Sequence, residues 1–227
     1  MQDKSTEDVS QPQEQTKKRQ RAVQQRAVQT RERILETAIE LFATRGYEGV
    51  AARNIETTAQ VKRGLVAYHF GTKEDLWRAS VDFLFAQMPP VSRDTERALQ
   101  DLPIEAQIRA QITLFVQFSA RYPAVSRIII QEGRSPTWRL DYLVENYVRP
   151  RVSWIDKIVG GGLNPHGLYA FIGAATLVFD VGAECRSLFG VDPYDEAFVR
   201  EHAKVVCDMV LGNNLLAIAP TDPGASG

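Results

Sequence analysis

Cationic and aromatic side chains cluster in a short stretch that begins at residue 62. Duplex DNA requires cations at its phosphates and polar side chains that reach base edges from a helix in the major groove. Arg63 could fork onto a guanine edge, which would give about 1 to 3 kcal/mol of base discrimination, whereas Lys62 could act only as a point charge. Lys62, Arg63 and Tyr68 are therefore candidates for contact with DNA. The alternatives are a solvated surface arginine at Arg63 and helix packing at Tyr68 and His69.

The histidines and cysteines do not fall in a catalytic or metal-binding motif. The sequence has three histidines and two cysteines, but no H-E-x-x-H, no G-x-S-x-G and no glycine-rich phosphate loop between a strand and a helix. Cys185, His202 and Cys207 could in principle meet at a metal, yet His202 and Cys207 are five residues apart and lie on different faces of a helix. We therefore expect no enzyme, cofactor or metal site, and both cysteines are expected to be buried.

The elements that position the basic cluster are three short helices. From Thr30, a fair N-cap, apolar residues recur at helical spacing through Ile34, Ala38 and Phe42 until Gly46. A second helix is expected over residues 52–60 and a third over 62–70, which is helix-turn-helix spacing. Thr72 opens a capping box for a fourth helix that runs to residue 87.

The remainder of the chain is predicted to be helical as well. Helices are expected at residues 103–122, 124–132, 137–159, 166–189 and 195–211, separated by proline and glycine breakers. No stretch alternates with period two, so the fold class is all-α with about nine helices. The expected domains are a disordered Gln-rich arm at 1–29, a helix-turn-helix domain at 30–76, a ligand-binding and dimerisation domain at 77–214, and a flexible tail at 215–227.

Charge is distributed unevenly although the formal net charge is only −1. Residues 17–78 carry a net +6, and the segments on either side are acidic, so a polyanion is expected to bind this region alone. Residues 1–29 contain no apolar core of a signal peptide. The longest nearly unbroken apolar run, 168–179, is shorter than the roughly 20 residues of a membrane span. A cytoplasmic protein without a membrane segment is expected.

Three segments in the first third of the chain resemble the DNA-binding domain of the tetracycline-repressor (TetR) family. They are 34–46, the Ile-x-x-x-Ala-x-Val pattern at 55–61, and the run from Gly64 that includes Tyr-His-Phe-x-x-Lys-x-x-Leu at 68–76. The resemblance covers about residues 30–85. It implies a homodimer that binds a double-stranded inverted-repeat operator and is controlled by a small-molecule effector. The DNA-binding residues expected on these grounds are Arg53, Lys62, Arg63, Gly64, Leu65, Tyr68, His69 and Lys73.

This segment departs from the family pattern at four positions. Ala51 stands where Ser or Thr usually caps the second helix, at a cost of about 1 kcal/mol if nothing replaces the cap. Gln60 occupies a turn position where glycine is usual, so it is expected to adopt positive φ. Glu56 replaces a common alanine, and Ala67 replaces a tyrosine that many members use on DNA.

The last two predicted helices carry faces suited to helix pairing, so homodimerisation through a four-helix bundle is expected. The alternative is that one chain covers both faces. The residues concerned are Gly173, Ala174, Ala175, Gly182 and Ala183 in one helix and Phe198, Val205, Val206, Met209 and Val210 in the other.

Aromatic residues are dense between residues 115 and 179, where a mainly apolar ligand cavity is expected. Plain core packing is the alternative for each of them. The expected ligand-binding residues are Phe115, Phe118, Trp138, Tyr142, Trp154 and Phe179, with Glu132, Arg139, Asp180 and His166 as polar candidates. The predicted function is a repressor released from DNA by a mainly apolar or aromatic molecule. A DNA-binding regulator without such a ligand and, less favoured, an all-α enzyme remain the alternatives.

Overall fold

A computed structural model describes residues 11–88, 101–158, 161–213 and 215. The regular secondary structure of this part of the chain is helical, which confirms the predicted all-α fold. It contains ten helices when the consecutive segments between Trp138 and Ile158 are counted as one. The chain divides into two compact units, Met1–Phe83 and Leu84–Gly227.

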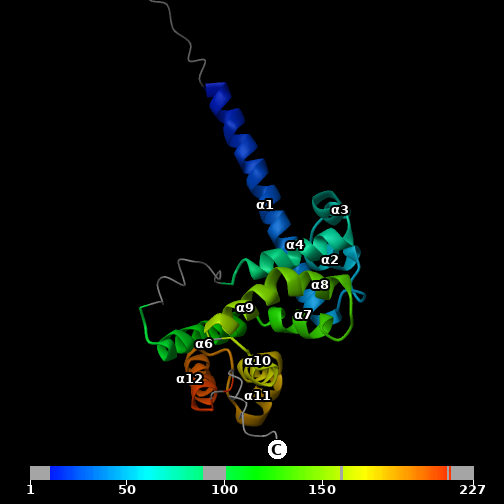
Figure 1. The fold of residues 1–227 in the computed structure, drawn as a ribbon. Coiled ribbons are helices and arrows are strands. Elements are labelled where there is room, and N and C mark those ends of the chain that lie inside the picture. The colour runs from blue at the N-terminus through cyan, green and yellow to red at the C-terminus, as the bar shows by residue number, and fades with distance from the viewer. Residues whose placement is uncertain (1–10, 89–100, 159–160, 214, 216–227) are drawn as a thin grey trace, which may run out of the picture. The chain divides into compact units, whose positions relative to one another are not determined.

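The first unit contains α1 (Gln11–Arg45), α2 (Ala52–Thr58), α3 (Leu65–Phe70) and most of α4 (Lys73–Phe85) (Figure 1). Apolar residues three or four positions apart share one face of a helix and can be buried together. The side chains buried here include Ile34, Ala38, Leu41, Phe42, Ile55, Val66, Phe70 and Trp77. Ile34, Ala38 and Phe42 were predicted from their spacing to share one apolar face, and all three are buried.

The N-terminal arm differs from the prediction, because α1 begins at Gln11 and continues through residue 30 without a break. The segment expected to be disordered is therefore helical from Gln11, and residues 1–10 lie outside the described residues. Thr30 does not cap a helix, since its hydroxyl donates to the carbonyl of Arg26 at 2.8 Å inside α1. Gln, Arg, Lys and Ala have good helix propensity, so this polar segment can extend a helix that the buried residues after Thr30 already stabilise.

Half of the capping box predicted before α4 is present, because the Thr72 N–H donates to the carbonyl of Phe70 at 3.0 Å and not to the Asp75 carboxylate. Thr72 Oγ1 accepts a hydrogen bond from the Asp75 N–H at 3.0 Å and donates one to Asp75 Oδ2 at 2.6 Å. These bonds satisfy an N–H group that has no partner within the helix. The two units divide after Phe83, inside α4, rather than after residue 76.

Six helical stretches begin in the described part of the second unit. They are α6 (Ile104–Arg121), α7 (Ala124–Glu132), α8 (Trp138–Leu143) with the π-helical segment η1 (Val144–Val148) and α9 (Arg149–Ile158), α10 (Pro165–Asp180), α11 (Gly182–Phe189) and α12 (Glu196–Gly212). The predicted breakers lie between them. One expected helix, 166–189, is wrong as a single element, because it is broken at Val181.

The break at Val181 has two local causes. The Tyr194 hydroxyl donates to the carbonyl of Phe179 at 2.5 Å, so this carbonyl already has a partner outside the helix. A Cβ atom at Gly182 would lie 2.9 Å from Tyr194 Cε2 and 3.2 Å from Pro193 Cγ, so only glycine allows this approach. The chain therefore turns by 74° between α10 and α11.

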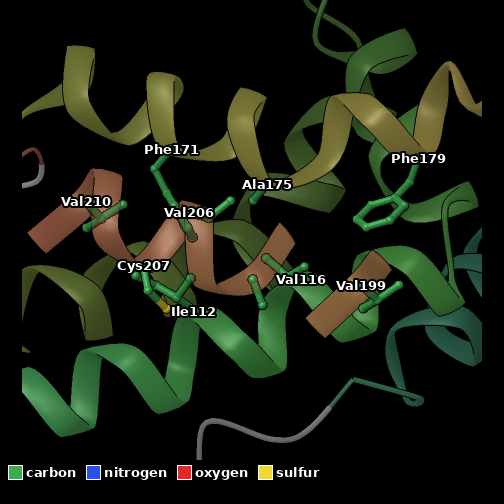
Figure 2. Close-up of a cluster of buried hydrophobic side chains, with 10 residues drawn as sticks. Ile112, Val116, Phe171, Ala175, Phe179, Val199, Val206, Cys207 and Val210 are labelled. Atoms are coloured by element: carbon green, nitrogen blue, oxygen red, sulfur yellow. The ribbon is translucent and has the colours of Figure 1, made fainter. Parts of the chain in front are cut away.

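The main core of the second unit lies where α6, α10 and α12 meet (Figure 2). α10 contributes Phe171, Ala175 and Phe179, and α12 lies alongside it. Figure 2 shows these side chains converging between the helices. The other members of the cluster are Ile112, Val116, Val199, Ala203, Val206, Cys207 and Val210. Both cysteines are free and buried, as predicted.

His202 gives this core a pH-dependent contact. Its ring lies 5.6 Å from the Phe179 ring and Nε2 lies 2.9 Å from the carbonyl oxygen of Ala174. Burial lowers the pKa of His202 below its ordinary 6.5, and the hydrogen bond to Ala174 offsets this in part. A depressed folded-state pKa adds stability above the unfolded-state pKa, and that stability is lost as the pH falls through the folded-state value.

We therefore expect the free energy of unfolding to fall as the pH drops below 6.5. The loss due to His202 should stay below about 1 kcal/mol, because the ring is only half-buried and solvent screens its charge. Urea unfolding of the wild type and of His202→Gln between neutral and mildly acidic pH measures the difference. An equal slope in both proteins would contradict the assignment.

None of the described helices is by itself long and apolar enough to cross a membrane. The pair α10 and α11 reaches the required length and apolarity only when joined across its 74° bend. Phe171, Ala175 and Phe179 of α10 are buried against other helices of the same unit.

Candidate DNA-binding surface and ligand cavity

The predicted DNA-contacting side chains lie mostly on the surface of the first unit. Arg53 in α2 is exposed, and so are Lys62 and Arg63. These two residues precede α3, which begins at Leu65 rather than at residue 62 as expected. Tyr68 is 80% exposed in the middle of α3. Helix packing therefore does not account for Tyr68, and its hydroxyl and ring are accessible to a partner.

Glu56 holds the turn between α2 and α3 in place. Its carboxylate is 7% exposed, and Oε1 accepts hydrogen bonds from the Gly64 N–H at 2.7 Å and the Val66 N–H at 3.2 Å. These are orphan donors at the start of α3, and Gly64 has no side chain that could cap them. The Glu56 side chain, which departs from the family pattern, thus caps the start of α3. The sequence analysis did not predict this role.

Two other departures behave as predicted. Gln60 has a φ of 53°, and it is the one residue other than glycine with positive φ in the described part of the chain. Ala51 provides no side-chain cap to α2. In partial compensation, Asn54 Oδ1 accepts a hydrogen bond from the Ala51 N–H at 3.0 Å.

Among the remaining predicted DNA-binding residues, Leu65, His69 and Lys73 are only partly exposed. The His69 ring contacts the rings of Tyr68 and Phe70, with centroids at 5.1 and 6.1 Å. These ring contacts of His69 lie within α3 itself. Gly64 is exposed and has a φ of 89°. The Lys73 ammonium lies 4.1 Å above the Tyr47 ring centroid, a cation–π contact that fixes its position.

The second unit contains a cavity of about 270 Å³ with predominantly apolar walls. Phe115 and Phe118 from α6 and Trp154 from α9, three of the predicted ligand-binding residues, line it. Side chains of α7 and α10 complete the walls, among them Val125, Ile129, Leu168, Phe171 and Ile172. A cavity of this kind binds a ligand mainly through apolar surface.

Three of the predicted ligand residues do not line this cavity. Phe179 is 0% exposed and belongs to the core between α10 and α12. Trp138 and Tyr142 lie in α8 and are absent from the cavity wall. Aromatic residues are dense in this part of the sequence, but helical spacing alone does not distinguish a core face from a cavity face.

The polar candidates also lie outside the cavity wall. Glu132 and Arg139 form a nearly buried ion pair at 2.8 Å that joins α7 to α8. Asp180 Oδ1 accepts a 2.7 Å hydrogen bond from Ser126 and lies 3.5 Å from Arg127 Nε. Burial raises the pKa of the Asp180 carboxyl above its ordinary value. These polar groups join helices to one another. The polar residues on the cavity wall are different ones.

The polar wall residues that sequence reasoning missed include Gln111 and Arg151, and the ring of Tyr147 also lines the wall. Tyr147 lies in η1, where five residues form a π-helical turn. Such turns are rare in proteins overall, but those that occur are often found at functional sites. A π-helical turn changes which residues share a face of the helix, and this change leaves no trace in the apolar periodicity of the sequence. The sequence pattern therefore did not place these residues at the cavity.

An exposed apolar stripe follows one face of α10. Tyr169, Leu177 and Val181 are 75%, 58% and 37% exposed, and Gly173 lies on the same face. Val205 of α12 is also exposed. Other residues of the predicted dimer faces are buried within the chain, namely Ala175, Gly182, Val206 and Val210. The intrachain alternative is therefore correct for those four residues.

The first unit contains a short helix, a turn and a second helix that is preceded by exposed cations. This arrangement is typical of DNA-binding helix-turn-helix proteins. The family model "Bacterial regulatory proteins, tetR family" matches residues 34–79. The chain therefore carries the DNA-binding domain of the TetR family of transcriptional regulators.

Similar proteins support the same family. The transcriptional repressor NicS of Pseudomonas putida is 27% identical over 109 residues, which are 48% of this chain and 50% of NicS. The repressor AcnR of Corynebacterium efficiens is 44% identical over 52 residues, 23% of this chain and 28% of AcnR. The chain thus matches half or less of the length of these relatives.

Solved structures share the fold beyond the DNA-binding helices. HlyIIR, a hemolysin II transcriptional regulator, has a TM-score of 0.59 at 20% identity, over 80% of this chain and 99% of HlyIIR. AibR, solved in complex with isovaleryl coenzyme A and operator DNA, has a TM-score of 0.57 at 18% identity, over 79% of this chain and 97% of AibR. At these identities the likeness concerns the fold alone.

Proposed function

We propose that this chain is a transcriptional repressor that binds a double-stranded inverted-repeat operator through α3. The observation that carries the proposal is the exposed set of Arg53, Lys62, Arg63 and Tyr68 around a turn fixed by a buried carboxylate. Cations at these positions attract phosphates. Because α3 is already ordered, binding to base edges does not incur the entropy cost of ordering it.

The proposed repressor acts as a homodimer. The exposed stripe formed by Tyr169 and Leu177 of α10 and by Val181 at its C-terminal end supports this, since contiguous exposed apolar surface marks interaction sites. A symmetric pair of such faces forms a closed isologous interface. The two helix-turn-helix units of the dimer then bind two half-sites of the operator, which raises the affinity and the specificity for that operator.

A small, mainly apolar effector in the second unit is proposed to release the operator. The cavity supports this part of the proposal, and Phe85, the last residue of α4, lines it. The same helix begins at Lys73 in the first unit, so a ligand that displaces its end acts on a continuous element. By linkage, the ligand weakens DNA binding only as far as it prefers the non-binding conformation.

Selection of bound duplexes from a random DNA pool by the purified chain tests the proposed operator binding. We expect enrichment of an inverted repeat whose half-sites are about one helical turn or more apart. Absence of enrichment at near-physiological salt, with a correctly folded helical protein, would contradict the proposal.

Arg63→Ala and Lys73→Ala should affect operator binding in different ways. Arg63→Ala should cost about 1 to 3 kcal/mol at one base position and relax the preference there. Lys73→Ala should weaken binding to all sequences alike and reduce the salt dependence, as loss of a phosphate contact does. Lys157→Ala is the charge-matched control, because the Lys157 side chain is exposed on α9 of the second unit. Identical behaviour of the first two variants would contradict the division of roles.

A further inference from the structure

Arg151 is a cation on the wall of the apolar cavity that has no acidic partner. Its Nη1 donates to the carbonyl of Tyr147 at 2.9 Å, and among the described residues no carboxylate forms an ion pair with it. Burial lowers the pKa of this guanidinium. A desolvated charge without a counter-charge is unfavourable, and an anion in the cavity would offset that cost.

The guanidinium is held by the same π-helical turn that shapes the wall. Tyr147 of η1 stacks on Phe85 with ring centroids 4.2 Å apart, and the Arg151 guanidinium carbon lies 5.8 Å from the Phe85 ring centroid. Together with the bond to the Tyr147 carbonyl, these contacts restrict the arginine. A restricted guanidinium presents its remaining N–H groups in a fixed fork that matches a carboxylate.

Gln111 supplies a second unused donor on the same wall. Its Nε2 atom is buried and has no hydrogen-bond partner in the described part of the chain. Buried amide groups without a partner are rare, and each calls for a ligand or an unplaced water. By contrast, the hydroxyls of Ser119 and Ser126 on this wall already donate, to the carbonyl of Phe115 and to Asp180.

The rest of the wall limits what kind of anion fits. The described residues that line the cavity include no Asp or Glu and one cation, Arg151. A phosphate ester would need more cations and donors than these. A single negative charge on an otherwise apolar molecule matches one arginine, one amide and a cavity of about 270 Å³.

We propose that the cavity binds small apolar carboxylic acids as their anions, with the carboxylate on Arg151 and Gln111 and the apolar body among Phe115, Phe118 and Trp154. This inference rests on the proposed ligand-controlled function and names the class of its effector. The Gln111 amide donates to one carboxylate oxygen and the Arg151 fork to the other.

The test compares acids with their neutral amides on the full chain without DNA. Benzoate, phenylacetate and hexanoate are titrated calorimetrically against benzamide, phenylacetamide and hexanamide, with intrinsic tryptophan fluorescence, to which Trp154 on the cavity wall contributes, as a second signal. At least one acid should bind, and about tenfold or more tighter than its amide, because charge-assisted hydrogen bonds to a guanidinium are lost in the amide. If no acid binds, or if an amide binds as tightly as its acid, the inference is overturned.

Two variants locate the carboxylate. Arg151→Gln should abolish the preference for the acid over the amide while the amide still binds, which also shows that the cavity is folded. Gln111→Leu should weaken the acid several-fold and keep part of the preference. An unchanged preference in Arg151→Gln would overturn the inference, and if that variant does not fold, the Gln111→Leu result and the wild-type ratio decide.

The inference and the proposed function fail in different ways. If neutral apolar ligands bind better than acids and still release operator DNA, the function stands and the assignment of the anion is wrong. If acids bind through Arg151 but leave operator affinity unchanged at saturation, the site is correct and the proposed control of DNA binding is wrong. Coenzyme A thioesters are included as a third arm, since binding of these alone would also overturn the assignment to free acids.

Discussion

Glu56→Ala is expected to reduce operator affinity at least tenfold and to destabilise the first unit by about 1 to 3 kcal/mol, the usual cost of leaving buried donors unsatisfied. The carboxylate oxygen receives the N–H groups of Gly64 and Val66 at 2.7 and 3.2 Å. α3 has only six residues, so it cannot hold its first turn by propensity alone. Fluorescence anisotropy with a labelled operator measures the affinity, and urea unfolding measures the stability.

Charge alone would give the opposite result for this substitution. Removing an acidic residue makes the DNA-binding unit more basic, which by itself strengthens attraction to phosphates. Glu74→Ala is the matched control, because Glu74 is exposed on α4 and pairs with Arg78 in an i, i+4 contact worth about 0.3 to 0.5 kcal/mol. Glu56→Gln keeps an acceptor oxygen and should retain most of the binding. Tighter binding by Glu56→Ala would show that α3 does not depend on the cap.

The DNA-binding helices could be predicted from the sequence because their determinants are local. Helical spacing located the buried side chains of α1 and α2, and a capping box located the start of α4 at Thr72. The limits of local reasoning appear at Glu56. Its partners are eight and ten residues away in sequence, so its type suggested only a departure from a pattern, while its function depends on the folded turn.

The start of α1 was missed for a different reason. Residues 19–29 are exposed and have no apolar periodicity, which is the usual sign of a helix. Their high helix propensity becomes sufficient once a buried helix follows directly, since elongation of a helix requires no new nucleus. Thr30 resembled an N-cap because the same residue types cap helices and are tolerated inside them when they hydrogen-bond to a carbonyl one turn back.

The ligand cavity could be predicted only in part. Phe115, Phe118 and Trp154 were expected in it, but its polar groups come from positions that packing determines. Arg151 and Gln111 lie on α9 and α6, forty residues apart in sequence, and meet the same cavity only in the fold. Aromatic density in the sequence therefore indicated a region, and the direction of each ring depended on a π turn and a helix break that have no simple signature.

Phe179→Ala is expected to be the most destabilising single substitution considered for the second unit, at about 3 to 5 kcal/mol. The ring is fully buried, lies 5.6 Å from the His202 ring and 6.1 Å from the Tyr194 ring, and fills the junction of α10 with α12. Its removal leaves a cavity that neighbouring helices can close only in part. Denaturant unfolding at fixed protein concentration measures the loss, since the stability of a dimer depends on concentration.

Phe118→Ala is the control that separates core packing from ligand binding. Phe118 is the same residue type and is also buried, but its ring borders the existing cavity. Truncation there enlarges a cavity instead of creating one, so the loss of stability should be smaller and the affinity for an apolar ligand should fall more. Phe179→Ala should lower stability while ligand affinity, measured well below the unfolding transition, stays close to wild type. The reverse outcome, with ligand affinity lost in Phe179→Ala and stability little changed, would place Phe179 at the ligand site, because a side chain that only packs the core contributes to the folded state and not to the bound one.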